Sequence, residues 1–362
     1  MTNTATTNNK PRRRALKPVP ADAFANQQLS LFQNFLANTS DERQALSNAV
    51  ALWDSIPRYS MSRNEMNSLR TAEGFLPVAE LSFNYRGRAL TATIYPAQVK
   101  GTDGRWKSYY PSAREELVEH ALRKISIQQH AGFYDGPTYR SGVRFSLYQL
   151  RKELEQQGHS LRYDQLIEAL DILSLSSIEI EGPTPEGDEA FARSTYLAAL
   201  TGVKRKDYDA DKNARWGAQF HPLVTQGIDQ ITYRQFNYQR LMKCSSQIAR
   251  WLVSQLVLKY TQAALTNSFE IRFSTIKRDS SLLGGYARER DAVAALDEAW
   301  EELKTLRVLS SVKKTEQRGK RNKLDDVIYT LFPTREFVTE QKAANRRQHD
   351  AKLSTLPATP LR

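Results

Sequence analysis

The chain has 362 residues, of which 40% are hydrophobic and 25% charged, a composition that excludes a disordered protein and allows two or three domains with cores of their own. Its 52 lysines and arginines outnumber its 40 aspartates and glutamates, and the resulting formal charge of +12 suggests a polyanionic partner. Because the chain has one cysteine, it can form no internal disulfide and no cysteine-rich zinc site. No apolar run is long enough to span a bilayer and no secretory signal is evident, so we expect a cytoplasmic protein with no membrane contact.

Residues 1–39 are polar and basic, and we expect a partly disordered extension there. Residues 1–20 hold five cations and no acid, a pattern that is also typical of a simple solvated tail. Just after them, Gln28, Leu29, Leu31 and Phe32 form a Q-L-x-L-F peptide, which resembles the motif by which bacterial replication proteins dock on the DNA-polymerase sliding clamp. The alternatives for this peptide are a chance match and a core helix over residues 24–36.

Residues 40–110 are expected to form a helical and β-hairpin region. The pattern predicts a helix over 40–53, and a capping box at Ser62 and Glu65 predicts a second, short helix. Apolar and polar residues alternate over 80–96 around Arg86-Gly87, which predicts a β-hairpin. The role of residues 76–110 stays open.

Residues 111–229 carry the element order of a winged helix-turn-helix, namely a helix, a strand, two helices joined by a short turn, and a hairpin. The predicted elements are a helix from the capping box of Ser112 and Glu115 to residue 129, a strand over 143–145, a helix from Ser146 to Gly158, a helix capped by Ser160 with Leu166, Leu170 and Leu173 on one face, a strand over 178–181, and an apolar stretch over 191–200.

The same order recurs over residues 230–340, with little residue identity between the two copies. The predicted elements are a long amphipathic helix over 236–264, a strand over 269–273, a helix over 274–283, a Gly284-Gly285 turn, a helix over 286–306, and strands over 308–312 and 326–331 that enclose a basic loop, 313–323. We expect residues 341–362 to be a flexible tail. The fold class is therefore α+β, with two tandem winged-helix domains.

The second copy is the better candidate for DNA binding. A helix-turn-helix places its second helix in the major groove while flanking cations hold phosphates. The first copy has acids at these places, Asp164, Glu168, Asp171, Glu179, Glu181, Glu186, Asp188 and Glu189, and we expect it to serve dimerisation with auxiliary DNA contact at most. The second copy has cations, Lys277, Arg278, Arg288, Arg290, Lys313, Lys314, Arg318, Lys320, Arg321 and Lys323. The alternatives for this copy are a core helix followed by a solvated hairpin and a protein-binding module.

No catalytic constellation is evident, so we expect no enzyme activity, no cofactor and no metal. A phosphate-binding P-loop is missing, and the five histidines are scattered. Asp207, Asp209 and Asp211 form D-x-D-x-D, but an EF-hand would need Gly and Glu where Lys212 and Ala218 stand. An acidic surface loop is the simpler interpretation, with a nucleic-acid enzyme that uses these aspartates as an alternative.

Two segments give the chain a family resemblance. HPLVTQGIDQITYRQFNYQRLMKCSSQIARWLVSQLVLKY (221–260) and WEELKTLRVL (300–309), in this order of elements, resemble the replication initiator (Rep) proteins of iteron-containing, theta-replicating bacterial plasmids, of the broad-host-range type. The resemblance covers roughly residues 110–340, and it depends on the order of elements more than on any one motif.

The resemblance implies that the chain binds directly repeated origin sites (iterons), promotes origin melting, and recruits the host helicase and sliding clamp. It also implies a homodimer in equilibrium with a monomer. Arg288 and Arg290 would then read bases, and the cations of 313–323 would hold phosphates. The alternative is a winged-helix transcriptional repressor, for which we would expect a palindrome over a promoter instead of direct repeats beside an AT-rich tract.

Overall fold

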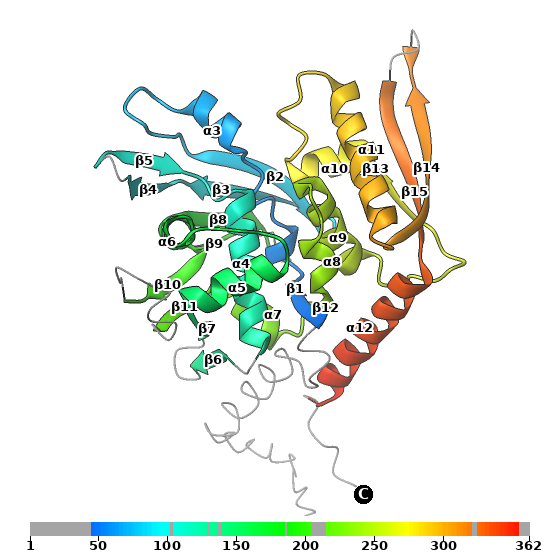
Figure 1. The fold of residues 1–362 in the computed structure, drawn as a ribbon. Coiled ribbons are helices and arrows are strands. Elements are labelled where there is room, and N and C mark those ends of the chain that lie inside the picture. The colour runs from blue at the N-terminus through cyan, green and yellow to red at the C-terminus, as the bar shows by residue number, and fades with distance from the viewer. Residues whose placement is uncertain are drawn as a thin grey trace, which may run out of the picture.

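The computed structural model describes residues 45–101, 104–128, 131–135, 140–184, 187–203, 215–320 and 324–354. Two winged-helix domains follow one another along the chain and share one continuous apolar core (Figure 1). Several predicted features lie outside the described residues: the basic extension, the clamp-type peptide at Gln28, Leu29, Leu31 and Phe32, the three aspartates at 207, 209 and 211, and Glu186, Arg321 and Lys323.

The first described segment pairs with a strand far along the chain. The prediction of a helix over 40–53 is wrong for its described part, because β1 (Leu46–Val50) is a strand that pairs antiparallel with β12 (Tyr233–Asn237). Four of its five residues are buried, so pairing with a distant partner outweighs the local helical pattern. A short 3-10 helix (Trp53–Ser55) and α3 (Arg63–Leu69) follow, and the capping box at Ser62 and Glu65 is confirmed.

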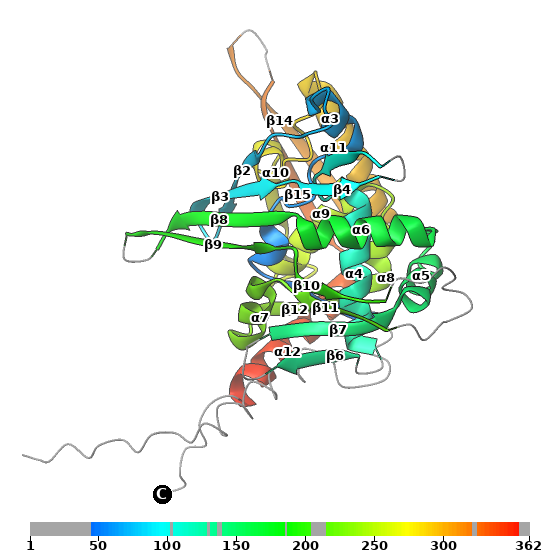
Figure 2. The same ribbon diagram turned by 90° about the vertical axis from the view of Figure 1, so that its left-hand side faces the viewer.

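The predicted 80–96 hairpin is confirmed and becomes part of the first winged helix. It consists of β2 (Ala79–Tyr85) and β3 (Arg88–Tyr95), and β3 pairs with the wing strand β8 (Ser177–Pro183). With β9 (Glu189–Thr195) the four strands form one sheet in the order β2-β3-β8-β9 (Figure 2). A second hairpin, β4 (Ala97–Lys100) and β5 (Trp106–Tyr109), forms a separate two-stranded sheet.

The helices of the first winged helix agree with the prediction except at one end. The caps at Ser112, Ser146 and Gly158 are confirmed, but Arg162 and not Ser160 is the cap of the third helix. The predicted strand over 143–145 is confirmed as part of β7, which pairs with β6 and β11. The remaining elements are α4 (Ala113–Ile127), β6 (Gly132–Asp135), β7 (Arg140–Ser146), α5 (Leu147–Gln156), α6 (Tyr163–Leu175), β10 (Leu197–Thr201), β11 (Arg215–Phe220) and α7 (Pro222–Asp229).

The second winged helix has the predicted order, with one helix divided. The single helix predicted over 236–264 is wrong, because Asn237 caps α8 (Tyr238–Met242) and Ser246 caps a separate α9 (Gln247–Lys259). The other elements are β13 (Phe269–Arg272), α10 (Phe273–Ser280), α11 (Glu289–Thr305), β14 (Leu309–Arg318) and β15 (Leu324–Pro333), with sheet order β13-β15-β14.

The chain continues into a terminal helix, α12 (Arg335–Ser354), so the prediction of a flexible tail is wrong for residues 341–354. The helix packs on β12, where the buried Arg234 guanidinium donates to Gln341 Oε1 at 3.0 Å and to Asn345 Oδ1 at 2.7 Å. The two acceptors are four residues apart and therefore lie on the same face of the helix.

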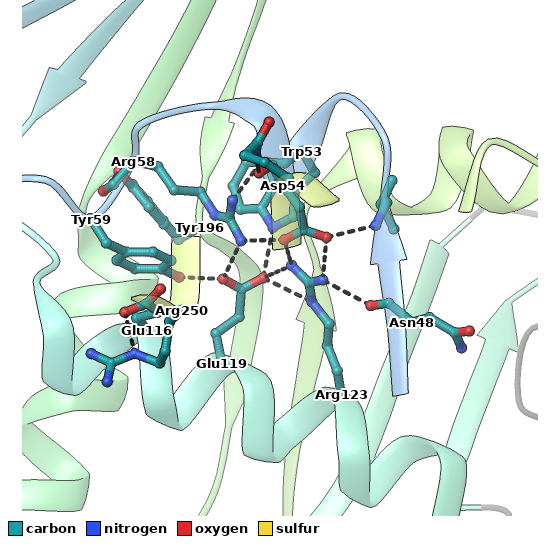
Figure 3. Close-up of polar contacts among 12 residues, drawn as sticks. Asn48, Trp53, Asp54, Arg58, Tyr59, Glu116, Glu119, Arg123, Tyr196 and Arg250 are labelled. Atoms are coloured by element: carbon teal, nitrogen blue, oxygen red, sulfur yellow. Dashed lines mark hydrogen bonds and ion pairs between the residues drawn. The ribbon is translucent and has the colours of Figure 1, made fainter. Parts of the chain in front are cut away.

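A buried network of charged side chains connects α4 to the segment that follows β1 (Figure 3). Arg123 of α4 donates to Asp54 Oδ2 at 2.8 Å and also pairs with Glu119, while Arg58 bridges Asp54 and Glu119. Each side chain is at most 5% exposed, and each charge has an opposite partner, as burial of ions requires. The network fixes the segment after β1 against α4.

Candidate nucleic-acid interface

The start of α11 presents two arginines to solvent, as predicted. Arg288 is the N-cap residue of the helix, and Arg290 follows in the first turn with a side chain that is 73% exposed. Arg290 Nε lies 3.4 Å from Asp291 Oδ1, a loose contact that the guanidinium can leave when a base edge or phosphate is offered. Leu283 is fully buried and anchors the turn that leads into α11. The start of this helix therefore has the position of a base-reading element, with two arginines beside two acids, Glu289 and Asp291.

The two predicted cations of α10 differ in their surroundings. Lys277 Nζ lies 3.6 Å from Glu289 Oε1 and so links α10 to the start of α11. Arg278 donates to Asp279 Oδ1 at 2.7 Å, and the same carboxylate oxygen accepts from the backbone N–H of Asn84 at 3.1 Å. Arg278 therefore lies at the contact between α10 and β2. Lys277 is the stronger candidate for a phosphate contact.

The wing is longer than predicted, because its strands continue into the basic segment. Lys313, Lys314 and Arg318 lie on β14 and not in a loop, while Lys320 follows the strand and is exposed. Lys314 pairs in register with the buried Tyr329, so its side chain points to the α11 face of the sheet, and that of Lys313 points to the opposite face.

Two of these wing cations already contact carboxylates. Lys314 Nζ lies 2.6 Å from Asp297 Oδ2 of α11, and Arg318 lies 2.6 Å from Glu316. Asp297 also accepts from the Tyr329 hydroxyl at 2.9 Å. Burial, reinforced by the Asp297 charge, raises the pKa of Tyr329 above its ordinary value, so this hydroxyl stays a donor. Asp297 thus holds the wing against α11 and masks one of its charges.

The acids of the first winged helix are partly neutralised by arginines. The pairs are Arg162 with Asp164 at 2.8 Å, Arg114 with Glu168 at 2.6 Å, and Arg193 with Glu179 at 2.5 Å. The repulsion that their sequence suggests is therefore weaker than a count of acids implies. Glu181, Asp188 and Glu189 remain exposed on the first wing, which keeps the second domain as the better phosphate-binding surface.

The sequence pattern did not indicate one arginine beside the site. Arg272 is the N-cap of α10, and its side chain is 56% exposed. Its charge is visible in the sequence, but only the observed start of α10 places it in the winged helix.

The described residues hold no cluster of three or more histidine, cysteine, aspartate or glutamate side chains that could bind a metal ion. Among the same residues, no helix is long and apolar enough to cross a membrane. Cys244, the one cysteine, is buried, and burial raises the pKa of its thiol to about 12.

No protein-family model matches the chain, and no curated protein is similar to it in sequence. Among solved structures, the chain is similar to a selenomethionine form of domains 2 and 3 of RctB, with a TM-score of 0.48 and 10% identity over 78% of this chain and 96% of that one. A second structure of RctB domains 2–3 gives a TM-score of 0.44 and 13% identity over 76% and 97% of the two chains. The Pi initiator protein, solved in complex with iteron DNA, gives a TM-score of 0.34 and 12% identity over 81% and 99%.

Proposed function

We propose that the chain is a non-enzymatic, sequence-specific DNA-binding protein that initiates plasmid replication at directly repeated origin sites. The observation that carries the DNA-binding step is the second winged helix, in which the exposed Arg288 and Arg290 begin α11 beside a two-stranded wing that bears Lys313 and Lys320. Exposed arginines at the start of the second helix and a basic hairpin are the two parts that a winged helix needs to read bases and hold phosphates. Glu289 and Asp291 lie in the same first turn, so the proposal depends on the two guanidinium groups and not on a net positive charge of that turn.

Two features of the sequence support the role in replication. They are the family resemblance of residues 221–260 and 300–309 and the clamp-type peptide. In this proposal, bound copies promote melting of adjacent AT-rich DNA and recruit the host helicase and sliding clamp. The chain exchanges between a monomer and a homodimer, and the first winged helix contributes to the dimer. The enzyme alternative predicts that alanine at Asp207, Asp209 and Asp211 abolishes origin function, whereas our proposal predicts that origin function is retained.

The decisive experiment starts from the DNA that flanks the gene. Binding to direct repeats of about 20 bp is measured by fluorescence anisotropy at several salt concentrations, with a scrambled duplex as control. If six to eight phosphates are neutralised, log K falls with log[salt] at a slope of about −5 to −7. Tight binding to a lone palindrome, with no preference for repeats, would support a repressor and contradict the initiator.

Clamp docking has a separate test. Replacing Leu31 and Phe32 by alanine removes the two apolar side chains of the peptide, so a pull-down with purified sliding clamp should lose its signal while DNA affinity stays unchanged. Clamp binding that survives this double substitution would refute the assignment of the peptide.

A further inference from the structure

One tryptophan of the chain is placed differently from the others. Trp106, the first residue of β5, is 53% exposed, whereas Trp53, Trp216, Trp251 and Trp300 are all at most 7% exposed. These five are all the tryptophans of the sequence. An exposed indole offers a large, rigid contact area with a polar N–H, so the surface around it is a candidate binding site.

The hairpin that carries this indole is basic. Lys100 of β4 is the register partner of Trp106, so both side chains lie on the same face of the hairpin. Arg105 and Lys107 precede and follow the tryptophan in sequence, so they point to the opposite face of the hairpin; Lys100 and Arg105 are exposed, and Lys107 is half-buried. An aromatic ring among cations is the arrangement that contacts nucleic acid, because the charges attract phosphates and the ring packs on sugars or bases.

The hairpin is held in place by the segment that follows α3. Arg70 donates to the backbone carbonyls of Gly74 at 2.9 Å and Ser108 at 2.6 Å, and Ser108 N–H donates to Gly74 O at 3.0 Å. The Tyr109 ring lies under two guanidinium groups, Arg63 at 4.8 Å and Arg70 at 5.1 Å. The surface is therefore preorganised, and little conformational entropy is lost when it binds.

Helix α3 connects this hairpin to the turn that precedes the DNA-reading helix. Glu65 of α3 packs against the turn before α11, where a Cβ at Gly285 would come within 2.6 Å of the Glu65 carboxylate. Arg63, in the same helix, covers Tyr109 of β5. A continuous path thus leads from the start of α11 through α3 to the hairpin.

We propose that the β4–β5 hairpin is a second DNA-contacting element, which binds the duplex beside the site that α11 reads. Lys100 and Arg105, the two exposed cations near the end of the hairpin, hold backbone phosphates there, and Trp106 packs against the sugar–phosphate surface. This inference rests on the proposed function, because it assigns the hairpin to the same DNA. It extends the bound duplex from the second winged helix toward the first.

The exposed indole supplies its own reporter. Because the other four tryptophans are buried, acrylamide quenching of intrinsic fluorescence reports mainly on Trp106. A duplex that carries the repeat plus flanking DNA should protect this fluorescence, and a duplex trimmed to the bases under α11 should protect it less. Trp106→Ala should lose the quenchable signal and weaken binding to the long duplex about tenfold, because the contact area that the indole buries against the DNA is lost.

A matched pair of double variants tests the cations. Lys100→Ala with Arg105→Ala should reduce the salt slope on the long duplex by about two, since two phosphate contacts are lost. Lys342→Ala with Arg346→Ala removes the same charge from exposed positions of α12 and should leave the slope unchanged. Circular dichroism of each variant checks that the fold is retained.

The outcomes separate the inference from the proposed function. If the wild-type protein does not prefer repeats over scrambled DNA, the proposed function fails. If it does, and the hairpin variants bind with the wild-type affinity and slope, the hairpin inference is wrong while the function stands. Protection of Trp106 only by a single strand, or only by an acidic peptide, would also overturn the inference.

Discussion

Arg250 of α9 donates from Nε to Glu116 Oε2 of α4 at 3.0 Å, and this ion pair joins the second winged helix to the first (Figure 3). The two side chains are 4% and 11% exposed. Arg250 also donates to the carbonyl of Cys244 at 2.9 Å, so the guanidinium bridges two elements of its own domain and one of the other. Together with the shared apolar core, this contact fixes the relative placement of the domains.

The first prediction concerns the loss of that pair. Arg250→Met should lower the free energy of unfolding by about 3–5 kcal/mol, because Glu116 would be left as an unpaired buried charge. Adding Glu116→Gln to this variant should restore part of the loss. Urea unfolding of the single and double variants measures both effects, and equal stability of Arg250→Met and wild type would contradict the bridging role.

The pH dependence of this variant follows from the pKa of Glu116, which burial raises above its ordinary value of 4.5 even though Arg250 lowers it. The folded protein therefore binds the proton more tightly than the unfolded chain, and ionisation above pH 4.5 reduces stability. Loss of Arg250 raises the pKa further, so the deficit relative to wild type should grow as the pH rises from 4.5.

The second prediction is a loss of stability in mild acid. Burial lowers the pKa of His120 to about 4 and that of His221 to about 3, from an ordinary value of 6.5. At a pH between the pKa of the folded protein and 6.5, each histidine is protonated in the unfolded chain and neutral in the folded protein. Stability therefore falls as the pH falls below 6.5. Two histidines should contribute a slope of up to about 2.7 kcal/mol per pH unit.

His221→Asn tests the histidine origin of that slope. His221 Nδ1 accepts from the backbone N–H of Leu223 at 3.1 Å at the start of α7, and an asparagine oxygen can replace this cap. The variant should therefore lose one proton from the pH dependence, about 1.4 kcal/mol per pH unit, whatever its stability at pH 7. An unchanged slope would show that His221 titrates normally in the folded protein.

Local signals in the sequence were sufficient for much of the fold. The caps at Ser62, Ser112 and Ser146 depend on residues three positions away, so the sequence shows them directly. The strand β1 could not be predicted, because its partner β12 lies nearly two hundred residues later. The same holds for β2 and β3, whose place beside the first wing depends on pairing with β8.

The sequence indicated which charged residues belong to the candidate site. It did not indicate which side chains those residues contact. The exposure of Arg290 at the start of α11 follows from the helical pattern and a glycine turn. The contact between Lys314 and Asp297 depends on strand register and on how α11 packs against β14, neither of which the sequence specifies. The basic hairpin at Trp106 escaped notice because its charges are spread over two strands.

The third prediction follows from the masked wing lysine. Asp297→Asn removes the carboxylate 2.6 Å from Lys314 but keeps an acceptor for the Tyr329 hydroxyl, so the wing should stay folded and gain a free charge. The salt slope of DNA binding should steepen by up to about one, and non-specific affinity should rise severalfold. Glu301→Gln is the matched control, because Glu301 pairs with Lys304 at the far end of the same helix. Equal effects of the two variants would show that only net charge matters.

The fourth prediction concerns base reading by the first turn of α11. Arg290→Ala, and separately Arg288→Ala, should weaken binding to the specific repeat by about 1–3 kcal/mol and leave non-specific binding nearly unchanged, because a bidentate contact to a base discriminates between sequences whereas a phosphate contact does not. Arg307→Ala is the matched control, since its side chain is as exposed, 75% against 73%, but lies beyond the C-terminal end of the helix. Anisotropy titrations on the repeat and on a scrambled duplex at one salt concentration give the ratio directly. If the alanine variants lose affinity equally on both duplexes, these arginines contact phosphates. Another element would then have to read the sequence.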